Sequence, residues 1–154
     1  MSKSVHDIMT SHPHTVFVTD SVESAYRKLK QYHVRHLPVV DGQGKLVGIM
    51  SERDFQRIMI REKSGVGEET YCFDSREIVE DVMSWPVQAI GEGTPIKTAA
   101  RLMLQDKLSA LVITSFENRP KGIVTTDDFL HYLIELDAKE LDRPINLVIP
   151  SLRL

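Results

Sequence analysis

The hydrophobic positions of this chain fall into short β-rich runs separated by stretches with helical spacing. Thr15–Val18, His36–Val40 and Lys45–Met50 predict strands, and a glycine-containing turn typical of a hairpin joins the last two. The apolar positions between the first two strands recur at the spacing of a helix that packs by one face: Val22, Ala25, Tyr26 and Leu29. Asp20 or Ser21 precedes them as an N-cap. The pattern therefore predicts a strand, a helix and a hairpin, in that order.

A strand that runs directly into a helix is written twice in the chain. Gly48–Asp54 reads G-I-M-S-E-R-D, and Gly122–Asp128 reads G-I-V-T-T-D-D. In each copy an apolar run ends in a hydroxyl residue, and an aspartate follows three residues later. The simplest interpretation is a capped helix start, with the hydroxyl residue as N-cap and the acid near the positive end of the helix dipole. The same N–H groups, hydroxyl and carboxylate also suit a small anionic ligand such as a nucleotide.

The whole order of elements returns at a constant offset of 74 residues. The matching positions are Asp7, Met9, Val22, Ala25, Leu37, Val39, Gly48, Asp54 and Phe55 in the first copy, and Asp81, Met83, Ile96, Ala99, Leu111, Ile113, Gly122, Asp128 and Phe129 in the second. Each unit is predicted to be a β-α-β-β-α repeat of about fifty residues, near the lower limit for an independent core, so the two units should pack together.

We therefore predict an α+β fold in which two tandem repeats form a pseudo-two-fold pair. The predicted boundaries are 1–63 for the first repeat, 64–78 for a linker, 79–138 for the second repeat and 139–154 for a C-terminal tail. Ligand sites are expected in the cleft between the repeats, where the two helix starts face each other.

Length and composition limit the class of protein. The chain has 154 residues, of which 42% are hydrophobic, and its net charge is −3. This allows a packed core and does not resemble the basic footprint of a nucleic-acid-binding protein. No apolar run approaches the roughly 20 residues of a membrane span and the N-terminus lacks a signal-peptide segment, so we expect a cytoplasmic protein without membrane insertion. The one cysteine, Cys72, is a poor candidate for a catalytic thiol.

The sequence contains little evidence for catalysis or for metal binding. An enzyme would need a nucleophile with its base, a metal triad or a phosphate-binding loop, and we find none, so we expect neither catalysis nor a catalytic cofactor. His12-Pro-His14 and His33–His36 could ligate a transition metal in a metal-sensing module. No cysteine or grouped acid joins these histidines, which favours surface histidines over a metal site.

The end of the chain carries more apolar residues than an exposed helix needs. Phe129, Tyr132, Leu133 and Leu136 follow helical spacing, which favours core packing and leaves a homodimer contact as the second interpretation. The apolar segment Ile145–Pro150 should pack on its own chain or on a partner.

The duplicated motifs resemble the cystathionine-β-synthase (CBS) domain pair, also called a Bateman module. The resemblance rests on the apolar-Pro-Val-Val-Asp run at Leu37–Asp41, on Gly-φ-φ-Ser/Thr-x-x-Asp in both copies, and on the tandem element order over Val5–Leu130. The second copy departs from the pattern at Leu111–Ser115, which lacks the proline and the aspartate. The resemblance implies a regulatory module, not an enzyme, that binds adenosine-containing ligands and signals occupancy to a partner by a conformational change.

The resemblance also implies two quasi-symmetric sites, each built from the Ser/Thr-x-x-Asp motif of one repeat and the first two strands of the other. Site A would combine Met9, His14, Arg35 and His36 with Thr125, Asp127 and Asp128. Site B would combine Met83, Gln88, Ser109 and Ala110 with Ser51, Arg53 and Asp54. A carboxylate can accept both hydroxyls of a ribose, and basic side chains and helix N–H groups can bind phosphates.

The two sites differ in charge. Site A has Arg35 and His36 on its wall and Asp127 before the ribose acid, whereas site B has Arg53 before its acid and the neutral Ser109–Ala110 pair on its wall. We hypothesise that both accept adenosine, from AMP, ADP, ATP, S-adenosylmethionine or an NAD(H)-type ligand, and that site A handles phosphates better. The expected partners are a second copy of the chain and a separate effector protein. The alternative is a protein-interaction or dimerisation scaffold with vacant clefts.

Overall fold

The computed structural model describes residues 3–63, 67 and 69–138, and it confirms the duplicated fold. The first repeat contains β2 (Val16–Phe17), α1 (Val22–Gln31), β3 (His36–Val40), β4 (Leu46–Ser51) and α2 (Glu52–Ile58). The second contains β7 (Ala89–Ile90), α4 (Ile96–Gln105), β8 (Ala110–Thr114), β9 (Pro120–Thr125) and α5 (Thr126–Ala138). Both repeats therefore have the predicted order β-α-β-β-α.

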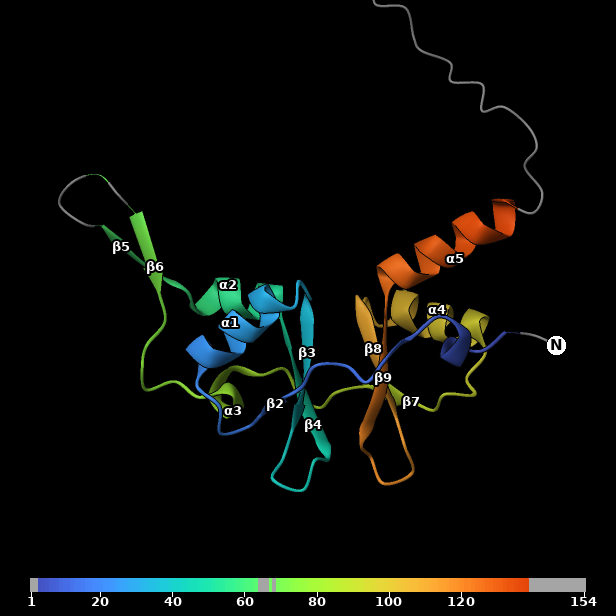
Figure 1. Ribbon diagram of the computed structural model, residues 1–154, viewed down its shortest axis with the longest axis horizontal. Coiled ribbons are helices and arrows are strands. Elements are labelled where there is room, and N and C mark those ends of the chain that lie inside the picture. Colours follow the sequence, from blue (N-terminus) through green and yellow to red (C-terminus); the bar gives the residue numbers. More distant parts are fainter. Residues whose placement is uncertain (1–2, 64–66, 68, 139–154) are drawn as a thin grey trace, which may run out of the picture.

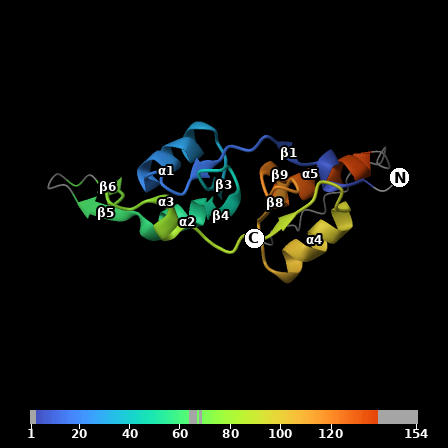
Figure 2. The same ribbon diagram turned by 90° about the horizontal axis from the view of Figure 1, so that it is seen from below.

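Each repeat builds its own sheet, and the two sheets stand side by side in the middle of the molecule (Figure 1). The first sheet has the order β2-β3-β4 and the second has the order β1-β9-β8-β7, where β1 is Thr10–Ser11. In both, the first strand of the repeat pairs in parallel with the strand after the helix, and the hairpin is antiparallel. The helices lie on the outer sides of the sheets, which leaves strand ends and helix starts at the junction (Figures 1 and 2).

The two repeats exchange their first segments. The short helix η1 (Val5–Asp7) and strand β1 pack on the second repeat, where Val5 N donates to Thr94 O at 2.9 Å and Thr10 pairs with Ile123. Helix α3 (Val79–Val82) packs on the first repeat in the equivalent way, and Val79 N donates to Asp20 O at 2.9 Å. Each half therefore contains residues from both copies of the sequence.

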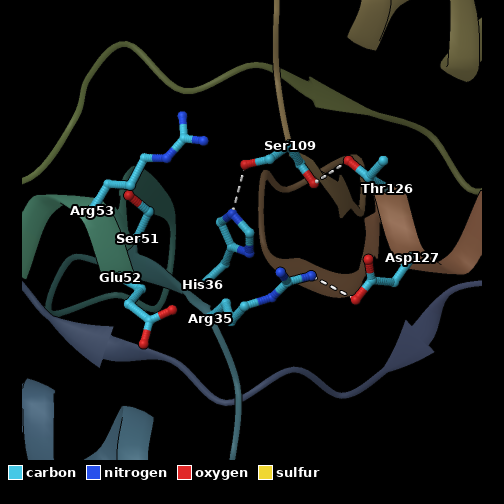
Figure 3. Close-up of a pocket in the computed structure, with 8 residues that line it drawn as sticks. All are labelled: Arg35, His36, Ser51, Glu52, Arg53, Ser109, Thr126 and Asp127. Atoms are coloured by element: carbon cyan, nitrogen blue, oxygen red, sulfur yellow. Dashed lines mark hydrogen bonds and ion pairs between the residues drawn. The ribbon is translucent and has the colours of Figure 1, made fainter. Parts of the chain in front are cut away.

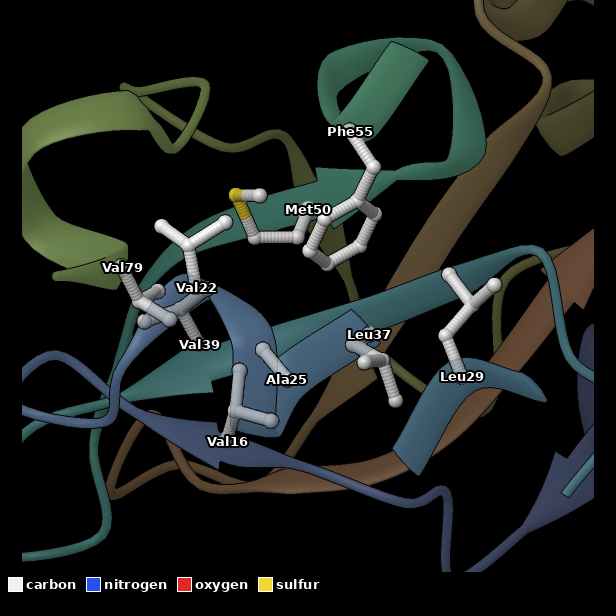
Figure 4. Close-up of a cluster of buried hydrophobic side chains, with 9 residues drawn as sticks. All are labelled: Val16, Val22, Ala25, Leu29, Leu37, Val39, Met50, Phe55 and Val79. Carbon is white, nitrogen blue, oxygen red and sulfur yellow. The ribbon is translucent and has the colours of Figure 1, made fainter. Parts of the chain in front are cut away.

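Each hydrophobic core contains one residue from the exchanged segment of the other copy. The first core is formed by Val16, Val22, Ala25, Leu29, Leu37, Val39, Met50, Phe55 and Val79, all of them buried (Figure 4). The second core is formed by Val5, Ala99, Met103, Leu111, Ile113 and Val124. Val79 and Val5 are the exchanged members, and each is 0% exposed. Burying these two side chains holds the repeats together, because neither core is complete with residues of one copy alone.

The segment between the two repeats contains a hairpin. β5 (Ile60–Lys63) and β6 (Glu69–Cys72) form an antiparallel hairpin with Ile60 opposite Cys72, and it projects away from both sheets (Figure 1). β6 lies within residues 64–78, which were predicted to be the linker. The pairing alternates charged and polar residues with few apolar ones, so its strands give no amphipathic signal.

In the described part of the chain, no helix is long and apolar enough to cross a membrane. The predicted tail at 139–154, including Ile145–Pro150, lies outside the described residues.

Candidate nucleotide-binding cleft

The two repeated helix starts have the predicted capping geometry. Asp54 Oδ2 accepts hydrogen bonds from Ser51 N and Ser51 Oγ, both at 2.7 Å. Asp128 Oδ2 accepts from Thr125 N at 2.6 Å and from Thr125 Oγ1 at 2.9 Å. The hydroxyl residue ends the strand and the acid closes the first turn, so the local sequence alone fixes where both carboxylates lie.

The second oxygen of each carboxylate distinguishes the two sites. Asp54 is 4% exposed, and its Oδ1 forms an ion pair with Arg57 and accepts a hydrogen bond from Ser84 Oγ at 3.3 Å. Asp128 is half-buried, and its Oδ1 accepts no hydrogen bond from the part of the chain that the structure describes. Asp54 is thus committed to structural contacts, whereas Asp128 has acceptor capacity left for a ligand.

A cavity of about 380 Å³, here called cavity A, opens at the Thr125–Asp128 helix start. Its wall brings together residues of both repeats: Thr10, Ser11, His12, Pro13, His14, His33, Val34, Arg35, His36, Ile123, Thr125, Asp127, Asp128 and His131. The size is that of a small organic ligand, and the lining combines imidazoles, a guanidinium and two carboxylates.

A second cavity of about 290 Å³, the central cavity, lies beside cavity A at the junction of the two sheets. It is lined by Arg35, His36, Ser51, Glu52, Arg53, Ser109, Thr126 and Asp127 (Figure 3). Two polar contacts cross between the repeats here. Arg35 Nη2 lies 2.6 Å from Asp127 Oδ2, and His36 Nε2 lies 2.8 Å from Ser109 Oγ (Figure 3). Arg35, His36 and Asp127 line both cavities, so these contacts form the partition between them.

The environment of His36 keeps its imidazole neutral. Burial lowers the pKa of His36 below its ordinary value of 6.5, and the neighbouring Arg35 lowers it further. Asp54 and Asp127 act in the opposite direction but are outweighed. The neutral ring can exchange a hydrogen bond with Ser109, so His36 connects the repeats without adding a charge at neutral pH.

The structure brings most of the predicted site residues together. His14, Arg35, His36, Thr125, Asp127 and Asp128 line cavity A, and Ser51, Arg53 and Ser109 line the central cavity. Asp54 lies next to them in an open hollow with Ser51 and Arg53.

Four predicted residues do not line these three cavities. Met83 and Met9 lie against Gly48 and Gly122, where each methionine packs onto a strand of the other repeat. Ala110 pairs with Thr125 across the β8–β9 hairpin, and Gln88 precedes β7.

Several residues that line or support cavity A were not predicted from the sequence. His131 follows Asp128 by three residues on α5, so helical spacing from the aspartate could have found it. His12 and His33 were considered only as metal ligands, and both have left-handed backbones with φ of 52°. Tyr32 does not line cavity A, but it stacks on the lining residue His14 with ring centroids 3.6 Å apart, a contact between residues that no local pattern connects.

The many histidines do not form a metal cluster. Across residues 3–63, 67 and 69–138, no three His, Cys, Asp or Glu side chains are grouped closely enough to hold a metal ion.

Tandem α+β repeats with exchanged first segments and a shared cleft define the class of protein. The family model for the CBS domain matches residues 5–61 and 79–135, one match for each repeat. The chain belongs to the CBS domain family.

Solved CBS domain pairs share the fold over their whole length. The CBS domain pair of protein MJ0100, in complex with 5′-methylthioadenosine and S-adenosyl-L-methionine, has a TM-score of 0.74 and 25% identity over 88% of this chain and 99% of its own. The CBSX2 protein in complex with AMP has a TM-score of 0.71 and 25% identity over the same shares of the two chains.

Two of the similar curated proteins are much longer than this chain. Inosine-5′-monophosphate dehydrogenase of Methanocaldococcus jannaschii is 31% identical over 83% of this chain and 23% of its own length. L-aspartate semialdehyde sulfurtransferase of the same organism is 28% identical over 80% of this chain and 22% of its own. The chain thus spans about a quarter of these relatives.

Proposed function

We propose that this chain is a regulatory module that binds an adenosine-containing ligand in the cleft between its repeats and is not itself an enzyme. AMP, ADP, ATP, S-adenosylmethionine and NAD(H) are the candidate ligand types. The observation that carries the proposal is the Asp128 carboxylate, which lines a cavity of about 380 Å³ together with Thr125 and whose Oδ1 accepts no hydrogen bond from the described residues.

Cavity A is the preferred site in this proposal. The Asp128 carboxylate would accept the two ribose hydroxyls, and the His14 ring, which is held by stacking on Tyr32, would offer a planar surface for the base. In the other half, Asp54 already bonds Arg57 and Ser84, so ligand binding there would have to displace these partners. The solved CBS pairs that hold 5′-methylthioadenosine, S-adenosyl-L-methionine or AMP support an adenosine ligand.

Signalling would pass through α5. Its first turn carries Asp127 and Asp128, and its later turns expose Leu130, Leu133 and Ile134 to solvent. A ligand held by the first turn would shift the helix and, with it, the surface offered to a second copy of the chain or to a separate effector protein.

The proposal is tested by thermal unfolding with adenosine, AMP, ADP, ATP, S-adenosylmethionine and NADH. A ligand present at a hundred times its Kd should add about 2.7 kcal/mol of stability. This corresponds to a rise in Tm of roughly 5–10 °C for a chain of this size. No shift with any of these compounds would favour the scaffold with vacant clefts.

Asp128→Asn tests the assigned carboxylate. The variant keeps the shape and one acceptor for Thr125 but removes the charge, so ligand affinity should fall by about tenfold to a hundredfold with little change in stability. Glu117→Gln is the matched control, because Glu117 is an exposed carboxylate outside the cavities that pairs only with Arg119 among the described residues. Equal affinity of Asp128→Asn and the wild type, measured by calorimetry, would contradict the assignment.

A further inference from the structure

We propose that Asp127 makes cavity A select adenosine compounds with an uncharged or cationic 5′ substituent over those with a 5′ phosphate. The inference rests on the proposed function, namely that Asp128 holds the ribose. Its starting point is the ion pair at the partition, where Asp127 Oδ2 lies 2.6 Å from Arg35 Nη2. A phosphate in cavity A would have to compete with this carboxylate for the guanidinium. This reverses the hypothesis from the sequence that site A handles phosphates better, which counted Arg35 without its ion pair to Asp127.

The charges on the cavity wall agree with this selectivity. Arg35 is the one lysine or arginine among the lining residues, and Asp127 and Asp128 are the two acids. With the imidazoles neutral, the lining therefore carries a formal charge of −1. Two carboxylates and a partly neutralised guanidinium repel a phosphate dianion, and they do not repel a thioether or a sulfonium.

The position of the ion pair places it in the path of a 5′ substituent. Asp127 is adjacent to Asp128 in the first turn of α5, and both Asp127 and Arg35 line the central cavity as well as cavity A. A substituent that leaves a ribose at Asp128 toward the interior of the cleft therefore passes along Arg35 and Asp127. Both side chains are about half exposed, 56% and 58%, so the pair can open when a better partner arrives.

The equivalent position in the other repeat does not carry an acid, so the fold itself does not require Asp127. At the offset of 74 residues, Arg53 occupies the position of Asp127 and Ser109 occupies the position of Arg35. Among the described residues the Arg53 guanidinium makes no ion pair, and it lies apart from the paired side chains in the central cavity (Figure 3). The same fold position thus carries opposite charges in the two halves, although the helix caps are made by other residues, Ser51 and Asp54 or Thr125 and Asp128.

The test compares AMP with 5′-methylthioadenosine by calorimetry at about pH 8, where ordinary imidazoles are neutral. The wild type should bind 5′-methylthioadenosine more tightly than AMP. Asp127→Asn frees Arg35 and removes the repulsion, so AMP affinity should rise by about fivefold to tenfold. Affinity for 5′-methylthioadenosine should stay within about twofold of the wild type, because the uncharged substituent does not respond to the charge.

Two variants separate charge from packing. Asp127→Glu keeps the carboxylate and should keep the wild-type preference, and Glu117→Gln removes an equal charge outside the cavities and should leave both affinities unchanged. An Asp127→Asn variant that binds 5′-methylthioadenosine normally and AMP no better than the wild type would overturn the inference but not the proposed function. A wild-type protein that binds neither compound would overturn both.

Discussion

At the scale of single residues, His36 is the group whose titration should affect stability. Its folded pKa lies below the ordinary value of 6.5, so as the pH falls the unfolded chain takes up a proton before the folded one does. Stability is therefore unaffected by His36 above about pH 7 and decreases as the pH falls through and below the ordinary value. In urea unfolding at a series of pH values, the stability of the wild type relative to His36→Gln should fall on acidification, since glutamine can bond Ser109 but does not titrate.

The control for this prediction is His6→Gln. His6 is exposed and lies 3.8 Å from Glu92, outside both cavities, so its replacement removes an imidazole from the surface instead of from the cleft. The difference curve for His6→Gln should not show the same fall. A constant difference between the wild type and His36→Gln from pH 7.5 to about 5.5 would contradict the lowered pKa of this half-buried histidine.

At the scale of elements, the hydrophobic period and the capping residues predicted the first repeat, and the constant offset of 74 residues extended that prediction to the second. α1 begins after the N-cap Ser21, whose side chain accepts from Ser24 N at 3.1 Å, and α2 begins after Ser51 as expected. The exchange of η1 and α3 could not be predicted, because these short segments look alike and either core could bury them. The Arg35–Asp127 contact was also invisible, since 92 residues separate the two side chains.

The exchange of segments depends on two glycines that allow close approach. A Cβ atom at Gly122, in β9, would overlap the sulfur of Met9, and a Cβ at Gly48, in β4, would overlap that of Met83. Gly122→Ala should therefore push Met9 away and destabilise the protein by roughly 1–3 kcal/mol in urea unfolding. Gly42→Ala is the matched control, because a Cβ at Gly42 meets nothing within 4 Å.

A double-mutant cycle isolates this contact. In a Met9→Ala background the methionine sulfur is gone, so Gly122→Ala should cost clearly less than it does in the wild type. An equal loss of stability in both backgrounds would show that the cost of Gly122→Ala does not come from overlap with Met9.

At the scale of the whole molecule, the two halves share a fold but differ in what their helix starts can do. Asp54 is buried and bonds Arg57 and Ser84, and α2 ends after seven residues at the hairpin β5–β6. Asp128 faces cavity A, and α5 continues for thirteen residues with an apolar surface. One half is thus better suited to structural support and the other to binding and communication, which is a physical reason for keeping both repeats in one chain.

The exposed apolar surface of α5 should mediate association between two copies of the chain. Leu130, Leu133 and Ile134 lie at i, i+3 and i+4 and are 54%, 57% and 65% exposed, so they form one apolar stripe. We expect two copies to bury these stripes against each other, because self-association covers both with a single symmetric contact. Analytical ultracentrifugation should then give about twice the 17.5 kDa of one chain.

Substitution within the stripe tests which surface associates. Leu133→Glu places a charge in the contact and should shift the protein to monomers without unfolding it, because the side chain is exposed within the subunit. Leu104→Glu is the matched control, since Leu104 is 81% exposed on α4 and lies outside the stripe. Dimers that persist in Leu133→Glu but dissociate in Leu104→Glu would move the interface to α4, and a monomeric wild type would leave α5 available for an effector protein instead.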